Sequence, residues 1–564
     1  MSRTLFWYIF KDLLRIFLMA SGVLAGIMSF GGLLRPLTEH GLNMGQVMHM
    51  LTYFQFPMTA YSLPIAALFA TTIVYGRLSA DNEIVACRAA GISHLAMALP
   101  AFVLGLSIAI LSLLLLSFVV PIFMLKAEKV IFSNVGQIIT NEIERTHQLK
   151  LEQEGDSITV FAQAAKVMPP DPTRPNDQVV VLASPMFVTY LPNPDKSPDA
   201  TRTPKDFYVA KQATCYINQN EQTDDLSFVT VLDGGIKFPR TVHGMEGGVD
   251  QSIFAADSQS EVRENTKFMD VFRLKELLND ESSSRRVRRV LDSFIVGEQR
   301  DTFLKSISDQ LAGEDSQARL IGTEDKQGIE YVISRGKAAT AMEDNKLIVG
   351  AATPEITRPV HVFQEKDGNV LRTFEAQAIE ISAIPDNEIG MLHVRIELND
   401  VIERVGESMT PRSKIPREFD VPMPQSIRSL PQIRTAKFYI RNTRLYGAQG
   451  KALDRERTFI WNGVRSELHF RASFAMSCLI LVMVGCALGM MFRSGNFLSA
   501  FALSVVPALI CIALIITGQH TCENVPKDLT NFHNPYELGR TLIWSGNVAV
   551  AVIAVGLLGR LQRQ

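Results

Sequence analysis

Six long apolar stretches, three near each end of the chain, enclose a polar middle. They cover Leu13–Leu34, Met48–Tyr75, Leu95–Phe123, Phe470–Phe492, Phe497–Thr517 and Thr541–Leu558. Each has roughly the 20 apolar residues that an α-helix needs to cross a hydrocarbon layer about 30 Å thick. We therefore predict an α-helical membrane bundle of six transmembrane helices, arranged 3 + 3, formed by residues 1–123 and 469–564.

Residues 124–468, between the two sets of apolar stretches, have the composition of a water-soluble domain. Short runs rich in β-branched and aromatic residues alternate there with Pro, Asp, Asn and Gly, as in strands separated by turns. The runs are Ser157–Gln163, Val179–Leu182, Met186–Leu191, Phe207–Ala210, Phe228–Leu232, Tyr331–Ile333, Leu347–Val349, Val360–Gln364, Ala378–Ile381 and Leu392–Leu398. Many short strands favour a sandwich, jelly roll or open barrel. We expect a large extracytoplasmic β-rich, jelly-roll-like domain.

Three segments of this middle region depart from the strand pattern. Apolar residues recur at helical spacing over Asp270–Leu311, which predicts a helical insertion in the β-rich domain. Thr410–Gln432 is rich in proline and basic residues, which predicts a loop or linker. Glu456–His469 is predicted to be a helix that runs directly into the fourth apolar stretch.

The distribution of basic residues in the short segments predicts the orientation of the bundle. One set of ends carries Arg3, Lys11, Arg15, Arg77, Arg88, Arg493, Arg560 and Arg563, whereas the short segments at the opposite ends carry Arg35, Lys527 and Arg540. Lys and Arg are enriched in cytoplasmic loops. Both termini should therefore be cytoplasmic, with the large domain on the outer side of the membrane.

Paired glycines predict where membrane helices approach closely. Gly22-x-x-x-Gly26 lies in the first apolar stretch and Gly485-x-x-x-Gly489 in the fourth. Glycines four residues apart lie on one helix face and let a neighbouring backbone come near. Such a face fits a static packing seam or a sliding gate between helices, and both interpretations are open.

The sequence offers no recognisable catalytic or cofactor motif. It lacks the phosphate loop Gly-x-x-x-x-Gly-Lys-Ser/Thr, the His-Glu-x-x-His zinc motif and the Gly-x-Ser-x-Gly nucleophile motif. Its six cysteines include no Cys-x-x-Cys, and its ten histidines are scattered, so no metal site is indicated. A net charge of −2 argues against a nucleic-acid partner. We expect a protein that is not an enzyme and has no cofactor.

Carboxylates, which would mark a proton relay, are missing from the interiors of the apolar stretches. This absence weakens the case for a proton-coupled transporter. If the protein moves a substrate, the energy should come from another subunit.

The segment between the second and third apolar stretches carries the most specific pattern. It reads Gly76-Arg-Leu-Ser-Ala-Asp-Asn-Glu-Ile-Val-Ala-Cys-Arg-Ala-Ala-Gly-Ile-Ser93. We predict a short helix over 79–90, with Ser79 as N-cap, Asp81 and Glu83 in the first turn and Gly91 ending it. Its charges could contact a soluble partner through Glu83, or simply face water.

Two segments resemble a known family. Arg77–Ser93, with Leu63-Pro64 upstream and Pro100 downstream, resembles the LptF/LptG (YjgP/YjgQ) permeases, the transmembrane subunits of the lipopolysaccharide export ABC transporter. Glu467-Leu-His-Phe-Arg471, followed by Gly485-Cys-Ala-Leu-Gly489, is similar to the family's fourth span. This chain has Phe474 where the family pattern has proline. The resemblance covers Arg3–Asn134 and Ile433–Arg563.

The resemblance implies a function and a set of partners. The helix over 79–90 would be the coupling helix that docks on a cytoplasmic ABC ATPase dimer, with Glu83, Asp81 and Arg88 at the contact. A second permease of the family, or a second copy of this chain, would complete a cavity for lipopolysaccharide or a similar glycolipid. The chain would lie in the cell inner membrane, with its large domain in the periplasm. The cargo would pass to this β-domain and on to a periplasmic bridge protein with a jelly-roll fold.

Residues at the outer ends of two apolar stretches are candidates for substrate binding. Arg35 follows the first stretch directly, and His469 and Arg471 lie at the start of the fourth. An arginine there can pair with a lipid phosphate, or its side chain can simply extend into the headgroup layer. Two other functions fit the sequence: a permease for a different amphiphile, and a membrane-anchored envelope scaffold or sensor with a protein-binding periplasmic domain.

Overall fold

The computed structural model describes residues 3–40, 44–132, 134–152, 157–169, 177–190, 204–219, 226–239, 246–258, 264–322, 329–343, 345–351, 358–366, 369–386, 390–405, 408–430, 436–442, 447–492, 497–525 and 534–563. It divides into two compact units. The first comprises Met1–Asp280 and Phe459–Gln564, and the second comprises Glu281–Thr458.

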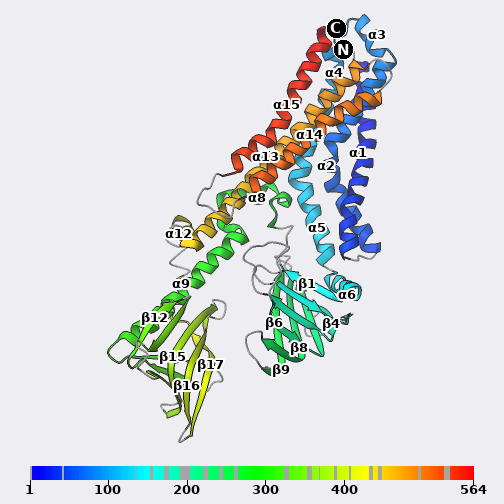
Figure 1. Ribbon diagram of the computed structural model, residues 1–564. Coiled ribbons are helices and arrows are strands. Elements are labelled where there is room, and N and C mark those ends of the chain that lie inside the picture. Colours follow the sequence, from blue (N-terminus) through cyan, green and yellow to red (C-terminus); the bar gives the residue numbers. More distant parts are fainter. Residues whose placement is uncertain are drawn as a thin grey trace. The chain divides into compact units, whose positions relative to one another are not determined.

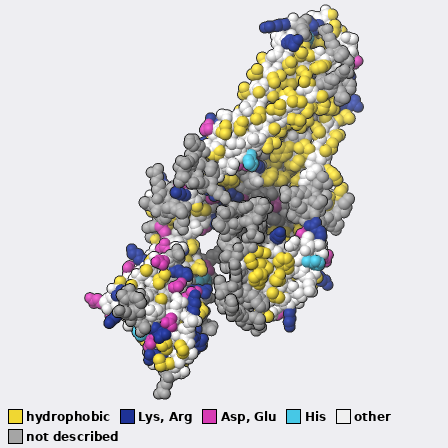
Figure 2. Space-filling view, in the orientation of Figure 1, with side chains coloured by type: hydrophobic (Ala, Val, Ile, Leu, Met, Phe, Trp, Pro, Cys, Tyr) yellow, Lys and Arg dark blue, Asp and Glu magenta, His cyan; other side chains and the backbone are white. Residues whose placement is uncertain are grey.

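Among the residues that the structure describes, six helices are long and apolar enough to cross a membrane, as the six apolar stretches predicted. They include α1 (Arg3–His40), α2 (Met44–Ala80), α4 (His94–Leu114), α13 (Gly447–Met491), α14 (Phe497–Glu523) and α15 (Tyr536–Arg563). After α4, the third span continues through a π-turn, η1 (Leu115–Val119), into α5 (Val120–Phe132). Hydrophobic side chains dominate the visible surface of these helices (Figure 2), which suits a lipid environment.

The fourth span packs tightly on the second through its two glycines, as predicted. A Cβ placed on Gly489 would lie 2.8 Å from Cβ of Tyr75 and 3.0 Å from the backbone nitrogen of Gly76. A Cβ on Gly485 would lie 2.9 Å from the carbonyl oxygen of Leu68. Only a residue without a side chain allows this separation.

The corresponding prediction for the first span is wrong among the described residues. Nothing lies within 4 Å of a Cβ placed on Gly22 or Gly26. Helix α1 instead contributes Leu13 and Phe17 to a core that also contains residues of α2 and α4. The glycines lie outside the face that these larger side chains define.

The first unit also holds a curled antiparallel sheet and the short helix α6 (Val135–Thr146) (Figure 1). Its strands are β1 (Gln148–Glu152), β2 (Ser157–Phe161), β3 (Ala164–Met168), β4 (Gln178–Ala183), β5 (Met186–Tyr190), β6 (Pro204–Val209), β7 (Gln212–Gln219), β8 (Leu226–Pro239) and β9 (Glu246–Ser258). They pair in the order β1-β2-β5-β6-β8-β7-β4-β3, with β9 on β8. Ile139 and Ile143 of α6 pack on Val180, Leu182 and Phe187 of the sheet.

Helices occupy the predicted helical segment after this sheet. They are η2 (Thr266–Phe268), α8 (Val271–Asn279), η3 (Glu281–Ser283) and the long α9 (Arg285–Ala312). Asp270 caps α8, because its Oδ1 accepts a hydrogen bond from the Arg273 backbone nitrogen at 2.7 Å. The helices lie in the sequence between two separate sheets.

The second unit contains the other antiparallel sheet. Its strands are β10 (Gln317–Ile321), β11 (Ile329–Ser334), β12 (Ala338–Glu343), β13 (Lys346–Ala351), β14 (Val360–Lys366), β15 (Asn369–Asp386), β16 (Met391–Val405) and β17 (Ser408–Pro422). Leu304 and Ile307 of α9 pack on its apolar face, with Phe374 and Ile396 in the same core. Short helices α10 (Gln425–Arg428) and α12 (Ala436–Arg441) follow.

The loop predicted for Thr410–Gln432 is wrong over its first half. Residues up to Pro422 form β17, whose Pro411 and Pro416 lie opposite Ile402 and Glu397 of β16. Among the described strands β17 pairs with β16 alone, so one side of it needs no hydrogen-bond donors. Proline cannot donate to a strand ladder, so within sheets it occurs mainly on edge strands such as β17, which have a partner on one side only. The ten predicted strand runs and the helix leading into the fourth span are confirmed.

Candidate functional site

A short helix turns the chain between the second and third spans. Helix α3 (Glu83–Ala89) is preceded by Asn82 in the left-handed conformation, with φ of 58°. It ends at Gly91, with φ of 82°, where Gly91 N–H bonds to Arg88 O at 2.8 Å and Ile92 N–H to Cys87 O at 3.0 Å. These two bonds form a Schellman motif. Gly91 was predicted in this position.

The predicted N-cap is wrong. Ser79 lies in the last turn of α2, and its hydroxyl donates to the Met490 carbonyl at 3.3 Å, joining α2 to the end of α13. Helix α2 extends through Ala80, and α3 begins only at Glu83. The chain changes direction at Asn82, because asparagine tolerates positive φ better than most residues with a side chain.

One isoleucine anchors α3 to the membrane helices. Ile84 is buried in a core that includes Leu78 of α2, Met97 of α4 and Leu561 of α15. Tyr75 donates a hydrogen bond from its hydroxyl to Met97 O at 2.8 Å, which ties α2 to α4 beneath it. Both ends of the chain and α3 lie at the same end of the helices (Figure 1).

The opposite side of α3 is open to a partner. Asp81 is exposed, Val85 is 42% exposed, and Glu83 and Arg88 are partly exposed. The three charged residues predicted at the coupling contact therefore lie on one short segment around α3. The segment presents an apolar side chain together with charges of both signs.

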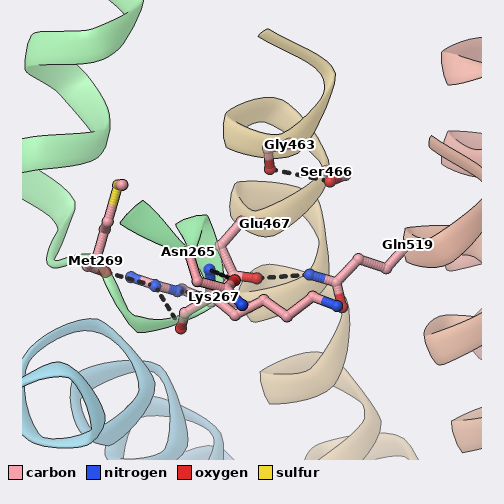
Figure 3. Close-up of polar contacts among 8 residues, drawn as sticks. Asn265, Lys267, Met269, Gly463, Ser466, Glu467 and Gln519 are labelled. Atoms are coloured by element: carbon pink, nitrogen blue, oxygen red, sulfur yellow. Dashed lines mark hydrogen bonds and ion pairs between the residues drawn. The ribbon is translucent and has the colours of Figure 1, made fainter. Parts of the chain in front are cut away.

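A second polar cluster lies at the other end of the fourth span. Glu467, one turn before Arg471 on α13, accepts hydrogen bonds from Arg471 Nε and from Gln519 Nε2 of α14, both at 2.6 Å. Glu467 and Arg471 are 3% and 1% exposed. Figure 3 shows Glu467 directed toward Gln519, with Lys267 and Met269 close by.

Arg471 also holds a distant part of the chain. Its Nη2 donates to the Met269 carbonyl at 2.7 Å and to the Lys267 carbonyl at 3.5 Å. Lys267 Nζ in turn lies 3.2 Å from Oε2 of Glu523, at the end of α14. We call Lys267, Met269, Glu467, Arg471, Gln519 and Glu523 the carboxylate clamp. It fastens the segment before α8 to two membrane helices.

The predicted substrate residues have different surroundings. Arg471 is enclosed in the carboxylate clamp. His469 is partly exposed, and its Nδ1 accepts a hydrogen bond from Trp544 Nε1 at 3.3 Å. Arg35 belongs to α1, but its side chain lies outside the described residues.

Four members of the carboxylate clamp were not predicted from the sequence, and one of them, Met269, contributes only its backbone carbonyl. Lys267, Gln519 and Glu523 come from segments far from Glu467 and Arg471 in the chain, and no local pattern distinguishes them. Over the described residues, no group of three or more His, Cys, Asp or Glu side chains is placed to hold a metal ion.

A comparison with protein-family models identifies the family of this chain. A family model described as lipopolysaccharide export system permease LptF/LptG matches residues 7–166 and 329–560, more than half of the chain. The unmatched residues 167–328 include β4–β9, α8 and α9. No curated protein matches the sequence.

Proposed function

This chain belongs to the lipopolysaccharide export permease family LptF/LptG. We propose that a separate cytoplasmic ATPase binds to α3 and drives the permease through this contact. As a permease, the chain is a non-catalytic transmembrane subunit of the lipopolysaccharide export ABC transporter. The observation that carries the proposal is the construction of α3. Its ends are fixed, its Ile84 is buried between three spans, and its outer side is exposed.

The anchoring of α3 supports a coupling role. Ile84 contacts the buried core shared by α2, α4 and α15, and Ser79 ties the same corner to α13. A push on α3 would therefore reach several spans at once rather than bend a loose loop. Glu83, Asp81 and Arg88 would provide the charged contacts to the ATPase, with Val85 between them.

The proposed orientation follows from the grouping of basic residues. Both chain ends and α3 lie at one end of the helices, and Arg3, Arg77, Arg88 and Arg560 belong to these segments. The positive-inside tendency favours the cytoplasm for that end. The β-rich regions, which follow α5 and precede α13, would then be periplasmic.

The partners we propose follow from family membership and from the absence of a phosphate loop. An ABC ATPase dimer would supply the energy, and a second permease of the family, or a second copy of this chain, would complete the lipid cavity. The cargo would pass to the β-rich region and then to a periplasmic bridge protein. Arg35 and His469 remain candidates for contact with the cargo, whereas Arg471 would have to leave the carboxylate clamp first.

A native thiol tests the orientation. Cys87 on α3 is partly exposed, whereas the other five cysteines are buried. A membrane-impermeant maleimide should label Cys87 in inverted membrane vesicles and leave it unlabelled in spheroplasts. In a C87S background, the exposed Ser413 of β17, changed to cysteine, should give the reverse pattern. Labelling of Cys87 in spheroplasts would contradict the proposal.

A charge reversal tests the coupling. Glu83→Lys should abolish co-purification of the ATPase, because the partly exposed carboxylate would become a repelling charge at the contact. Asp309→Lys, an exposed reversal on α9, is the matched control and should retain the ATPase. If a folded Glu83→Lys protein retained as much ATPase as the control, Glu83 would not be part of the contact.

A further inference from the structure

Three nitrogen-bearing side chains surround the ring of Tyr536, at the start of α15. The guanidinium carbon of Arg465 lies 5.9 Å from the ring centroid, and that of Arg540 lies 6.0 Å from it. The ring centroid of His469 lies 6.4 Å away. Arg465 and His469 are one turn apart on α13, and Arg540 follows Tyr536 by one turn on α15. Two membrane helices thus direct these groups to one aromatic ring.

Two tryptophans complete the walls of this cluster. The Arg465 guanidinium carbon lies 3.4 Å from the ring centroid of Trp461, a close cation–π contact. On the other side, Trp544 donates its Nε1 hydrogen to His469 Nδ1. When neutral, His469 must then carry its proton on Nε2, which leaves Nε2–H as a donor. We call Trp461, Arg465, His469, Tyr536, Arg540 and Trp544 the aromatic–arginine cluster.

The positive charge of the cluster is not balanced in the described part of the chain. Arg540 pairs with Glu537 at 2.6 Å, and its side chain is still 45% exposed. Arg465 is partly exposed and forms no ion pair with any described carboxylate. A guanidinium held by aromatic rings is fixed in position while its N–H edges stay available to an anion.

The cluster is also held rigidly. The Asn534 Oδ1 atom accepts hydrogen bonds from Asn462 Nδ2 at 3.0 Å and from the Tyr536 backbone nitrogen at 3.1 Å. Asn462 donates in addition to the Cys522 carbonyl at 3.0 Å. The start of α15 is therefore fixed against α13 before any ligand arrives, which lowers the entropy cost of binding.

Tryptophan, tyrosine and arginine are common at the edge of a membrane, where rings and charged ends meet the headgroups. Such a belt does not require the side chains to converge. Here two arginines and a histidine converge on Tyr536 at the outer ends of the fourth and sixth apolar stretches. We propose that the aromatic–arginine cluster binds the phosphate group of a phosphorylated lipid. Arg465 forms the main phosphate contact, while Arg540 and His469 Nε2–H supply further donors.

This inference deepens the proposed function, on which it rests, because it names a place on the permease for the phosphorylated end of a glycolipid. Trp461 and Trp544 are partly exposed beside the donors, and their rings have apolar faces. Such faces suit the sugar or glycerol carbons beside a phosphate. The cluster would thus recognise the junction between phosphate and backbone rather than the acyl chains.

The tryptophans of the chain provide the measurement. The sequence has three, Trp7, Trp461 and Trp544, and two of them belong to the cluster. In a Trp7→Phe protein in dodecyl maltoside micelles, which contain no phosphate, tryptophan emission reports on the cluster alone. Titration with phosphatidic acid should change the emission saturably. Diacylglycerol, which lacks the phosphate, should leave it unchanged.

Substitutions then test the assigned donors. Arg465→Gln should weaken the apparent affinity for phosphatidic acid at least about 10-fold, since it removes hydrogen bonds to a charged group. Arg465→Lys should retain part of the affinity. Arg560→Gln removes an exposed arginine from the other end of α15 and should bind as the Trp7→Phe parent does. Should Arg465→Gln fail to fold, Arg540→Gln tests the same site.

Three results would overturn the inference: no emission change with phosphatidic acid, an equal change with diacylglycerol, or unaltered affinity in folded Arg465→Gln and Arg540→Gln. If inorganic phosphate alone reproduced the change at the same concentration, the lipid assignment would be wrong. The titration contains no ATPase or nucleotide, so Glu83→Lys should bind phosphatidic acid normally. Failure of the coupling proposal is thereby separated from failure of this one.

Discussion

Arg471 donates its Nε hydrogen to the Glu467 carboxylate across one turn of α13, and both side chains are almost completely buried. The same carboxylate accepts a hydrogen bond from Gln519, while Arg471 reaches the carbonyls of Lys267 and Met269. Burying an isolated charge is costly, but a pair with further hydrogen bonds can be tolerated. The pair therefore joins two spans to a segment that lies outside the residues matched by the family.

We predict that removing one member of this pair destabilises the protein more than removing both. Arg471→Met leaves the Glu467 carboxylate buried without its positive partner, which should lower the free energy of unfolding by about 3–5 kcal/mol. The double variant Glu467→Gln with Arg471→Met removes both charges and should recover much of that loss. Thermal unfolding followed by fluorescence-detected size exclusion compares the three proteins. Equal destabilisation of single and double variants would show that the charge pairing is not the cause.

The same arginine should hold the segment before α8 in place. In Arg471→Met, backbone amides of residues 266–269 should exchange with deuterium faster, because two carbonyls of the segment lose their donor. Lys267→Met removes a partly exposed ion pair with Glu523 and should have a much smaller effect. Hydrogen exchange measured by mass spectrometry distinguishes them. The reverse ranking would assign the fastening to the Lys267–Glu523 pair.

Close contact between α2 and α13 gives a packing prediction. Gly489→Val places carbon atoms where Tyr75 and the Gly76 backbone already lie, and the backbone atom cannot move aside. We expect a loss of about 1–3 kcal/mol, together with loss of the Ser79–Met490 hydrogen bond. Gly26→Val is the matched control, because nothing lies within 4 Å of its added Cβ. Thermal stability in detergent should fall in the first variant only.

The second unit should respond to acid through Glu397. The Glu397 carboxylate lies 2.6 Å from Lys414 Nζ and 2.8 Å from Arg395 Nη2. The hydrogen bond from Lys414 is the main cause that lowers the pKa of Glu397 below its ordinary value of 4.5. A lowered pKa contributes stability above the unfolded-state value, and that contribution is lost as pH falls through the folded-state value. Lys414→Met should therefore flatten the acid limb of stability below about pH 4.5, measured as hydrogen exchange of β16 in the full chain. An unchanged acid limb would contradict this assignment. The effect should be modest, because Lys414 is 53% exposed.

Sequence pattern was sufficient where the physics is local. Apolar length gave the six spans, and β-branched runs such as Leu392–Leu398 gave the strands. Gly91 predicted the end of α3, because glycine readily adopts the positive φ that such an end requires. Helical spacing gave α8 and α9. Each of these features depends only on residues that are close together in the sequence, so each can be predicted from its own segment.

The remaining features depend on partners far away in the chain. Strand runs do not reveal pairing, so the division of the β-rich region into two sheets was not predictable from them. Pro411 and Pro416 suggested a loop, because edge position, which makes proline tolerable, is a tertiary property. Ser79 has a hydroxyl that could cap a helix, but this hydroxyl donates its hydrogen bond to the Met490 carbonyl instead. The carboxylate clamp needed three segments to meet.

The π-turn over Leu115–Val119 interrupts the α-helical hydrogen bonding of the third span. Beyond it, Pro121 lacks the backbone N–H that would reinforce the first turn of α5. The second span is one helix from Met44 to Ala80 that contains Pro57 and Pro64, and each proline removes a backbone hydrogen bond inside the helix. The two spans that flank α3 would therefore bend at different depths if α3 were displaced: the third span at its π-turn, and the second near its two prolines.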